Sequence, residues 1–286
     1  MNKKNNLIVY RKDELEKVEN LIKITNKLLL PKEIIIESHH WEWWYKLDKV
    51  WQILFLKTIR IIKSKNLDYY LENFRLFEPK DFMGIENQIS TNELEQIINS
   101  KHIIIGKNVE INNLKPLSMI SNLETLYCYS SKINCLRPLK KLKNLKKVIF
   151  LCNNIKKLKH LKKLIKLEEL TFYDNKVKNL KPLNNLVRLK RIWFDYNKVE
   201  NLEPLRGLFN LESLTFRHNK VKNLEPLIYL KKLENLRFEN NKVETLNPIK
   251  DLKNIKTIFC KNNLINEQEI INFKINNKIE DTNDEY

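Results

Sequence analysis

Glycine is scarce in this sequence of 286 residues, which contains only Gly84, Gly106 and Gly207. No two of them lie within 20 residues of each other. Loops that cradle phosphate groups, including dinucleotide-binding turns, need several closely spaced glycines so that the backbone can approach the ligand. The sequence therefore excludes a glycine-rich phosphate loop and argues against most nucleotide-dependent enzyme classes.

Long apolar runs are also missing, since no stretch approaches the ~20 residues that a membrane-spanning helix needs. The first apolar stretch, Leu7–Tyr10, is too short for a secretory signal and is followed at once by charged residues. The four cysteines form no Cys-x-x-Cys pair. Without an export signal we expect reduced thiols and a cytoplasmic location.

Patterns typical of catalysis and metal binding are equally lacking. The sequence has no Gly-x-Ser-x-Gly or His-Glu-x-x-His motif and no zinc-type Cys and His spacing. The run His39–Glu42 contains metal-capable side chains, but adjacent residues point apart on a helix or strand. His102, His160 and His218 are isolated from any nucleophile in sequence. We therefore expect a protein that is not an enzyme and that binds no metal, cofactor or small-molecule substrate.

Positive charge is abundant and unevenly distributed. Lys and Arg number 53 and Asp and Glu 35, which gives a formal net charge of +18. Residues 101–276 hold 36 of the basic and 16 of the acidic side chains, whereas residues 1–100 are nearly neutral and residues 277–286 form an acidic tail. Such a charge attracts polyanions or acidic proteins. Richness in Lys, Asn and Ile is also typical of an A/T-rich genome, which leaves open how much of the charge is functional.

A period of 22 residues dominates the rest of the chain. It is marked by asparagines in phase at Asn153, Asn175, Asn197, Asn219, Asn241 and Asn263, with Ser131 in the equivalent place one period earlier. Each unit reads L-x-x-L-x-F-x-x-N-K-V-x-x-L-x-P-L-x-x-L-x-x, and units begin at Leu123, Leu145, Leu167, Leu189, Leu211, Leu233 and Ile255. A degenerate unit precedes them from about Lys101, and the last unit decays after Asn263.

This pattern resembles the leucine-rich repeat family, and its 22-residue length and L-x-P-L step resemble the internalin-like and protein-phosphatase-regulator-like subclass. The resemblance covers about 175 of the 286 residues and places the repeats in residues 101–276. It implies an α/β solenoid, a horseshoe or arc in which each unit adds one short strand to a concave parallel β-sheet. It also implies the role of an adaptor, regulator or enzyme inhibitor.

The residues of the unit fit this architecture on physical grounds. Strand alternation places residues four and six inside the solenoid and residues three, five and seven outside. Residue six is Phe in five units, which predicts a stacked spine of Phe150, Phe172, Phe194, Phe216 and Phe238. The in-phase Asn can satisfy backbone groups where the chain leaves the sheet, and the recurring Pro favours a non-strand return segment. We expect local irregularity where His160 replaces this Pro and where Cys128 and Cys260 replace Phe.

Residues 1–100 lack the repeat, resemble no family, and are predicted to form a small helical domain that covers the open end of the solenoid. Helical spacing occurs in Leu15, Val18, Leu21, Ile22, Ile24, Leu28 and Leu29, and again in Trp44, Leu47, Trp51, Leu54 and Ile61. Asn92, Glu95 and the pair Ile97–Ile98 indicate a last short helix. We predict that four tryptophans fill the core of this helical domain, and a partner-binding aromatic patch is the alternative. They are Trp41, Trp43, Trp44 and Trp51.

The outward residues of the strands form the first candidate binding surface. Exposed Tyr, Trp and Arg are the residue types that anchor protein interfaces. Strands ~4.8 Å apart give a surface about 30 Å long, enough for an interface of roughly 800 Å² per partner. We predict that one protein partner binds there, with tolerated surface side chains as the alternative. The candidate residues are Tyr127, Tyr129, Ile149, Leu151, Tyr173, Arg191, Trp193, Asp195, Tyr196, Arg217, His218, Arg237 and Phe259.

The charge favours a partner that is acidic or associated with nucleic acid. The predicted role is that of an adaptor or inhibitor, and one specific case is a phage-encoded inhibitor of a nucleic-acid enzyme in a bacterial defence complex.

A second candidate surface is electrostatic, because Thr125 to Leu167 contain 13 Lys or Arg and no Asp or Glu. Stacked units would merge these cations into one patch for RNA, DNA, a ribonucleoprotein or an acidic protein. Lys contacts phosphate with little base readout, so such binding would be sequence-tolerant. A solvated lysine face is the alternative. Besides Lys132, the candidate polyanion-binding residues are Arg137, Lys140, Lys141, Lys143, Lys146, Lys147, Lys156, Lys157, Lys159, Lys162, Lys163 and Lys166.

Overall fold

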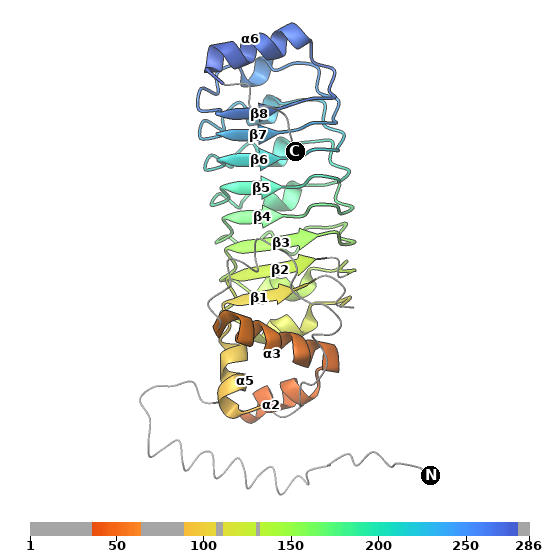
Figure 1. The fold of residues 1–286 in the computed structure, drawn as a ribbon, viewed down its shortest axis with the longest axis vertical. Coiled ribbons are helices and arrows are strands. Elements are labelled where there is room, and N and C mark those ends of the chain that lie inside the picture. The colour runs from red at the N-terminus through yellow and green to blue at the C-terminus, as the bar shows by residue number, and fades with distance from the viewer. Residues whose placement is uncertain (1–35, 64–88, 107–110, 130–131, 280–286) are drawn as a thin grey trace, which may run out of the picture.

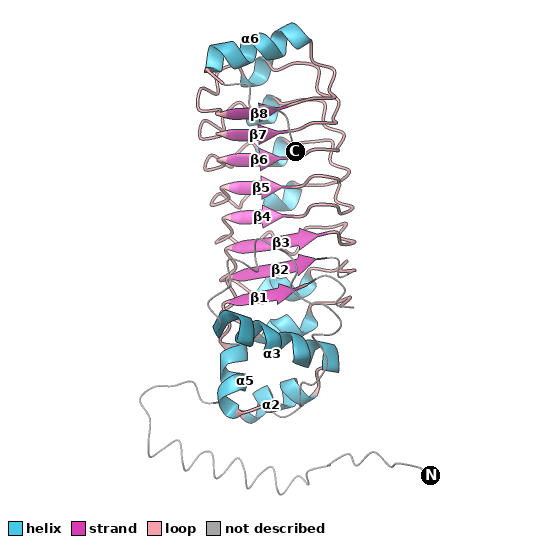
Figure 2. Ribbon diagram, viewed as in Figure 1, coloured by secondary structure: helices cyan, strands magenta, loops and turns pink. Residues whose placement is uncertain are grey.

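The computed structural model describes residues 36–63, 89–106, 111–129 and 132–279. Within these ranges the chain builds an elongated solenoid in which strands stack one above another, with helices at both ends (Figure 1, Figure 2). Eight parallel strands pair in sequence order in a single open sheet. They are β1 (His102–Ile105), β2 (Thr125–Tyr129), β3 (Lys147–Leu151), β4 (Glu169–Thr171), β5 (Arg191–Trp193), β6 (Ser213–Thr215), β7 (Asn235–Arg237) and β8 (Thr257–Phe259). The predicted solenoid is confirmed, including a strand for the degenerate first unit.

The strand register repeats with the sequence period. From β2 onward each residue pairs with the residue 22 positions later, as Glu169 does with Arg191. Equivalent residues of successive units therefore lie side by side and form columns along the solenoid. The position of a residue in the unit determines which side of the molecule it occupies.

The return segments contain short 3₁₀ helices. They are η2 (Lys115–Met119), η3 (Arg137–Lys141), η4 (Lys181–Leu183), η5 (Glu203–Leu205), η6 (Glu225–Leu227) and η7 (Asn247–Ile249). Each has proline in its first turn, where the missing N–H has no intrahelical partner to lose. The unit with His160 in place of proline makes only turns there, which confirms the expected irregularity.

The core is a continuous apolar column behind the sheet. The five phenylalanines at residue six are fully buried. The rings of Phe172, Phe194, Phe216 and Phe238 stack with centroids 5.4, 5.7 and 5.5 Å apart. Offset stacking at such distances is favourable beyond the area that it buries. The predicted spine is confirmed, with Cys128 and Cys260 buried at its two ends.

Three helices cover the first end of the sheet. They are α2 (Ser38–Tyr45), α3 (Lys49–Lys63) and α5 (Thr91–Ile98). Helix α3 packs against α5 and β1 (Figure 1). The second predicted helical run is divided between α2 and α3, because the chain leaves the helix at Lys46 and restarts where Asp48 accepts a hydrogen bond from the Trp51 N–H at 3.0 Å. The earlier predicted run, at residues 15–29, lies outside the described residues.

The tryptophans of this helical region are largely internal, as interpreted from the sequence. Trp44 and Trp51 are buried, and Trp41 and Trp43 are half-buried. The Phe55 ring lies 5.2 Å from the Trp51 ring and 5.4 Å from that of Trp43. Helix α5 begins with a capping box between Ser90 and Glu93, which explains the predicted short helix.

A helix that the repeat pattern does not predict closes the other end. Helix α6 (Glu267–Asn277) lies beyond β8 and buries Phe273. Its Glu269 carboxylate accepts hydrogen bonds from the Thr245 hydroxyl at 2.6 Å and from the Leu246 N–H at 2.7 Å. Most of the predicted acidic tail, residues 280–286, lies outside the described residues. No helix in the described ranges combines the length and apolar character needed to cross a membrane.

Candidate protein-binding face of the sheet

The side of the sheet opposite the phenylalanine spine carries residues three, five and seven of each unit, and we call it the open face. Trp193 stands near its centre on β5 and is 45% exposed. Its partners in the sheet register, Thr171 on β4 and Thr215 on β6, are small and buried. The indole is therefore flanked by short side chains and projects from the sheet, as an anchor residue at a protein interface does.

Three aromatic rings form a row at the carboxyl ends of β4 to β6. The Tyr173 and Tyr196 rings meet edge to face with centroids 5.3 Å apart. The Tyr196 and His218 rings stack with centroids 4.1 Å apart. The Asn240 amide lies 3.2 Å from His218 Nε2 and continues the row into the next unit. Stacking in this row orders the rings before any partner arrives, so little conformational entropy remains to be lost on binding.

The backbone beneath this row is left-handed. Residue eight has φ between 47° and 58° in six successive units, including 53° at Tyr196 and 51° at His218. This conformation suits Asn and Asp, which occupy the same place at Asp174, Asn240 and Asn262. Tyr196 makes the turn less stable there than Asn would, whereas His, like Asn and Asp, is tolerated in this conformation. An unfavourable choice at a position with a better alternative points to a role beyond folding.

Charged groups of the open face are paired with one another. The Asp195 carboxylate, which is buried, accepts hydrogen bonds from the Arg217 N–H and from Arg217 Nε, both at 2.8 Å. Arg237 Nη2 lies 3.4 Å from the Glu239 carboxylate, and the Arg237 guanidinium lies 4.3 Å from the centre of the Phe259 ring. The pairs hold both arginines in fixed positions, and both side chains remain partly exposed.

Two polar atoms in this cluster have no hydrogen-bond partner in the described structure. They are Arg237 Nε and Glu239 Oε2, and both are buried. A buried donor and a buried acceptor left unsatisfied are a costly arrangement. Glu239 was not among the binding residues predicted from the sequence, although its place at residue seven puts it in the same column as Arg217.

A second ion-pair group crosses three strands at residue three. The Glu169 carboxylate lies 2.8 Å from Lys147 Nζ and also contacts the Arg191 guanidinium. Burial alone would raise the pKa of Glu169, but the hydrogen bonds from Lys147 and Arg191 outweigh it and hold this pKa below its ordinary value. At neutral pH the group is therefore fully ionised.

The first strands depart from the predicted exposure. Tyr127 and Ile149 are only 5% and 8% exposed, and Tyr129 and Leu151 are half-buried. Tyr127 and Ile149 pair across β2 and β3, so two large apolar side chains lie side by side and join the apolar core cluster. Of the predicted binding residues, those on β4 to β8 and the turns that follow remain accessible, apart from the buried Asp195.

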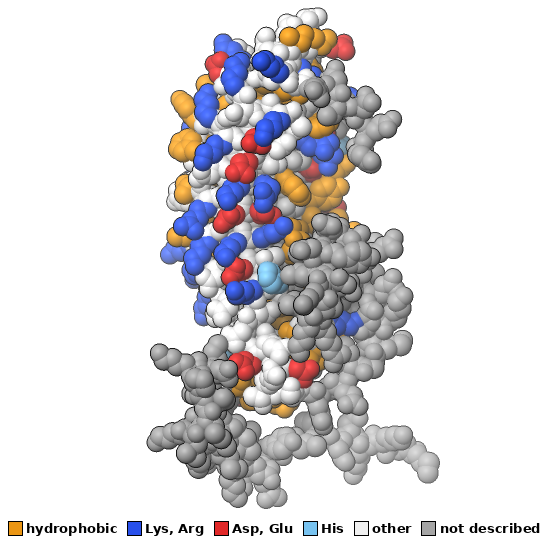
Figure 3. Space-filling model, turned by 60° about the vertical axis from the view of Figure 1, so that its left-hand side comes forward, with side chains coloured by type: hydrophobic (Ala, Val, Ile, Leu, Met, Phe, Trp, Pro, Cys, Tyr) orange, Lys and Arg blue, Asp and Glu red, His pale blue; other side chains and the backbone are white. Residues whose placement is uncertain are grey.

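The thirteen Lys and Arg side chains of residues 125–167 are distributed over different sides of the solenoid. Lys147 belongs to the open face, and Lys146 lies on the edge where strands begin, with its Nζ 2.6 Å from the Glu124 carboxylate. Figure 3, which turns that edge forward, shows Lys and Arg side chains with Asp and Glu interspersed. Most of the others are exposed in the return segments. Partial burial and the proximity of Lys163 and Lys140 lower the pKa of Lys143, so these three cations crowd together across two units.

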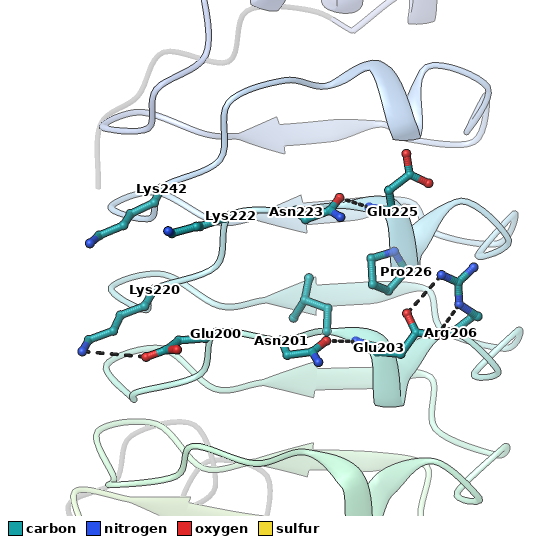
Figure 4. Close-up of a pocket in the computed structure, with 11 residues that line it drawn as sticks. Glu200, Asn201, Glu203, Arg206, Lys220, Lys222, Asn223, Glu225, Pro226 and Lys242 are labelled. Carbon is teal, nitrogen blue, oxygen red and sulfur yellow. Dashed lines mark hydrogen bonds and ion pairs between the residues drawn. The ribbon is translucent and has the colours of Figure 1, made fainter.

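The side of the solenoid behind the sheet has a shallow cavity of about 640 Å³ (Figure 4). Lys220, Lys222 and Lys242 line one end of it, and Arg206 with its partner Glu203 lines the other. Some of its charged groups are paired with neighbours in the same wall, as Lys220 is with Glu200. Within the described ranges no three His, Cys, Asp or Glu side chains come together in a way that could hold a metal ion.

Comparisons with known proteins agree with this geometry. The family profile described as "Leucine Rich repeats (2 copies)" matches residues 165–207. No match was found among curated proteins. An internalin of Listeria monocytogenes is 21% identical with a TM-score of 0.61, over 68% of this chain and 58% of that one. A leucine-rich repeat protein of Leptospira interrogans is 25% identical with a TM-score of 0.60, over 68% of this chain and 51% of that one.

A third similar structure is the leucine-rich repeat ectodomain of the receptor kinase GASSHO1/SCHENGEN3 of Arabidopsis thaliana, in complex with CASPARIAN STRIP INTEGRITY FACTOR 2. It is 21% identical with a TM-score of 0.54, over 61% of this chain and 22% of that one. The chain thus spans little more than half the length of the internalin and less of the other two. The 22-residue units, their parallel strands, the family profile and these structures together identify the chain as a leucine-rich repeat protein.

Proposed function

We propose that this protein is a non-enzymatic interaction module that binds one protein partner on the open face of its sheet. The observation that carries the proposal is Trp193, which projects from the middle of the sheet between two buried threonines. Folding explains neither its exposure nor its size, since Thr occupies the same column on both neighbouring strands. Trp is also among the residues most enriched in interface hot spots.

The surroundings of Trp193 support the same function. The stacked row of Tyr173, Tyr196 and His218 and the Arg237–Phe259 pair add aromatic and Arg side chains to the same face. Strands β4 to β8 at ~4.8 Å spacing give a row about 20 Å long, which suits a compact epitope of one protein.

The role that follows is that of an adaptor or inhibitor, and a nucleic-acid enzyme is one candidate target. A cytoplasmic location, expected from the sequence, is part of this proposal.

The experiment is site-specific photocrosslinking followed by affinity measurement. A photoreactive phenylalanine at position 193 should crosslink the partner in cells, whereas the same group at Tyr45, an exposed aromatic residue on α2, should not. With the purified partner, Trp193→Ala should weaken binding about 30-fold, equivalent to ~2 kcal/mol, and Tyr45→Ala should have little effect. Equal crosslinking from both positions, or unchanged affinity for Trp193→Ala, would overturn the proposal.

Polyanion binding is the second candidate function, supported by the thirteen Lys and Arg of residues 125–167, most of them exposed, with no Asp or Glu among them. Phosphate-driven binding weakens steeply as salt rises, whereas an aromatic contact weakens modestly. Replacing Lys140, Lys141, Lys162 and Lys163 with Glu should abolish RNA or DNA binding and leave capture by the open face intact.

A further inference from the structure

A row of exposed apolar side chains lies on the edge where the strands begin. Residue 21 of three consecutive units is Ile165, Val187 and Phe209, which are 62%, 52% and 58% exposed. Tyr229, at residue 19 of the next unit, is 54% exposed and lies with its ring 5.7 Å from the Arg206 guanidinium. We call these four residues the apolar ridge. Figure 3 shows hydrophobic side chains on the left-hand rim of this view, among Lys and Arg.

Folding does not require apolar residues at this place. Residue 21 is an exposed Lys in the units on either side, at Lys143, Lys231 and Lys253. The local backbone is also held in the same way whichever residue is present. Asn at residue 22 donates to the carbonyl of residue 21 in the preceding unit, at 2.9 Å from Asn210 to Val187 and at 2.6 Å from Asn254 to Lys231.

The edge around the ridge carries a net positive charge, although residue two of the units adds Glu124, Glu168, Glu212 and Glu234 among Lys146, Lys190 and Lys256. Residues 18–22 of the six units that begin at Leu123 to Leu233 contain one acidic residue, Asp251. They contain twelve basic residues, namely Lys140, Lys141, Lys143, Lys162, Lys163, Lys166, Arg188, Arg206, Lys231, Lys232, Lys250 and Lys253. All of these except Arg206 are exposed. A partner for this edge must therefore be both anionic and able to accept apolar side chains.

The shape of the edge favours a lipid surface over an acidic protein. Ten of these twelve cations are Lys, the same share as in the whole chain, so the choice of Lys over Arg does not separate the two partners. An apolar chain segment docks into a groove, whereas these side chains stand out as a ridge. Ile, Val, Phe and Tyr flanked by lysines match the surface of an anionic bilayer, where apolar groups enter the headgroup boundary and Lys meets the anionic lipids.

We infer that the apolar ridge inserts into the surface of an anionic phospholipid bilayer and that the surrounding lysines bind its headgroups. The solenoid then lies with its long axis along the membrane, because the ridge runs from unit to unit. The open face is on a different side of the solenoid, so this binding leaves it accessible to a protein partner. The inference does not depend on the protein-binding role of the open face, but its lysines include Lys140, Lys141, Lys162 and Lys163 of the second candidate function.

The test is co-sedimentation of the full chain with vesicles of phosphatidylcholine containing 30 mol% phosphatidylserine, compared with vesicles of phosphatidylcholine alone. The unchanged protein should bind the anionic vesicles at least ten-fold more strongly. The triple variant Ile165→Lys, Val187→Lys and Phe209→Lys copies the neighbouring units and adds three positive charges. Insertion predicts at least a ten-fold loss of binding, whereas attraction by charge alone predicts a gain.

A control variant keeps the ridge and adds charge on the same edge. Asn184→Lys with Asn185→Lys places Lys where other units already have it, and this variant should bind as well as or better than the unchanged protein. Circular dichroism and the urea midpoint check that each variant is folded, and Trp193→Ala should bind vesicles normally. Absence of vesicle binding by the unchanged protein, or undiminished binding by the triple Lys variant, would overturn the inference; the first result would leave an acidic protein as the occupant.

Discussion

The side chain of Asn219 connects two units of the solenoid. Its Nδ2 donates to the carbonyl oxygen of Phe194, 25 residues earlier, at 3.0 Å, and its Oδ1 accepts from the N–H of Val199 at 2.9 Å. The same Nδ2 also contacts the carbonyl oxygens of Phe216 and Arg217 in its own unit. Equivalent bonds recur at Asn175, Asn197 and Asn241. One buried amide therefore satisfies backbone groups in two consecutive turns.

Asn219→Ala should lower the free energy of unfolding by about 3 kcal/mol, because buried backbone groups of two units lose their partner. Asn219→Asp should cost at least as much, since it keeps the acceptor for Val199 but turns a carboxylate oxygen toward carbonyl oxygens. Urea unfolding followed by circular dichroism measures both. Asn185→Ala, in an exposed turn, is the control and should change the value by less than about 0.5 kcal/mol. An equally small change for Asn219→Ala would show that this side chain does not stabilise the contact between the two units.

Phe194→Ala should be among the most destabilising substitutions in the chain. The ring is fully buried and stacks on Phe172 and Phe216, so truncation opens a cavity in the middle of the spine. We expect a loss of about 3–5 kcal/mol, and a smaller loss for Phe194→Leu, which refills part of the space. Urea midpoints of the two variants measure the difference. Equal losses would show that ring volume is not what stabilises this layer.

The Glu169 group predicts a pH-dependent stability. Because Lys147 and Arg191 hold the folded-state pKa of Glu169 below its ordinary value of 4.5, its stabilisation is complete above that value. The stabilisation is lost as the pH falls through the folded-state pKa. Glu169→Gln should therefore lower stability by about 1 kcal/mol at pH 7 and by much less at pH 3. Urea unfolding at both pH values tests this.

The control for this pair of measurements is Glu200→Gln. Glu200 lies 3.9 Å from Lys220, and both side chains are largely exposed, so the change should have no measurable effect at either pH. A pH-independent loss for Glu169→Gln would show that packing, rather than ionisation, accounts for its effect.

The cysteines should differ strongly in reactivity, although none forms a disulfide. Cys135 is exposed and Cys152 half-buried, whereas Cys128 is buried and burial raises its pKa well above the ordinary value. Because the thiolate is the reactive form, a maleimide at pH 7.5 should modify Cys135 first and Cys128 at least about 100-fold more slowly. Peptide mass spectrometry follows each site, and all four should react in 8 M urea. Rapid native modification of Cys128 would contradict the buried end of the spine.

Much of the candidate site follows from the sequence because the register of the sheet copies the period of the repeat. Trp193, Tyr173 and Arg237 take outward places in the unit, and the structure puts them on the open face. Exposure is less predictable, since it depends on the neighbouring strand. Tyr127 and Ile149 occupy the same column as Trp193 but shield each other, whereas Trp193 is flanked by Thr.

The repeat pattern alone does not predict the apolar ridge. Ile165, Val187 and Phe209 recur every 22 residues, but apolar residues elsewhere in the unit are buried, so pattern alone does not distinguish the ridge from core. Helix α6 gave no periodic signal either, because a segment that ends a solenoid must differ from the units it covers.

The linear order of residues is sufficient to predict the solenoid, its strands, the phenylalanine spine and the asparagine positions. These features depend on interactions between each unit and the next, which repeat with the sequence. Which outward side chains are accessible, how helix α6 covers the second end, and which unit positions form a ridge depend on contacts in three dimensions. Those contacts join residues of different units and of the non-repeating ends, so the sequence of one 22-residue unit does not specify them.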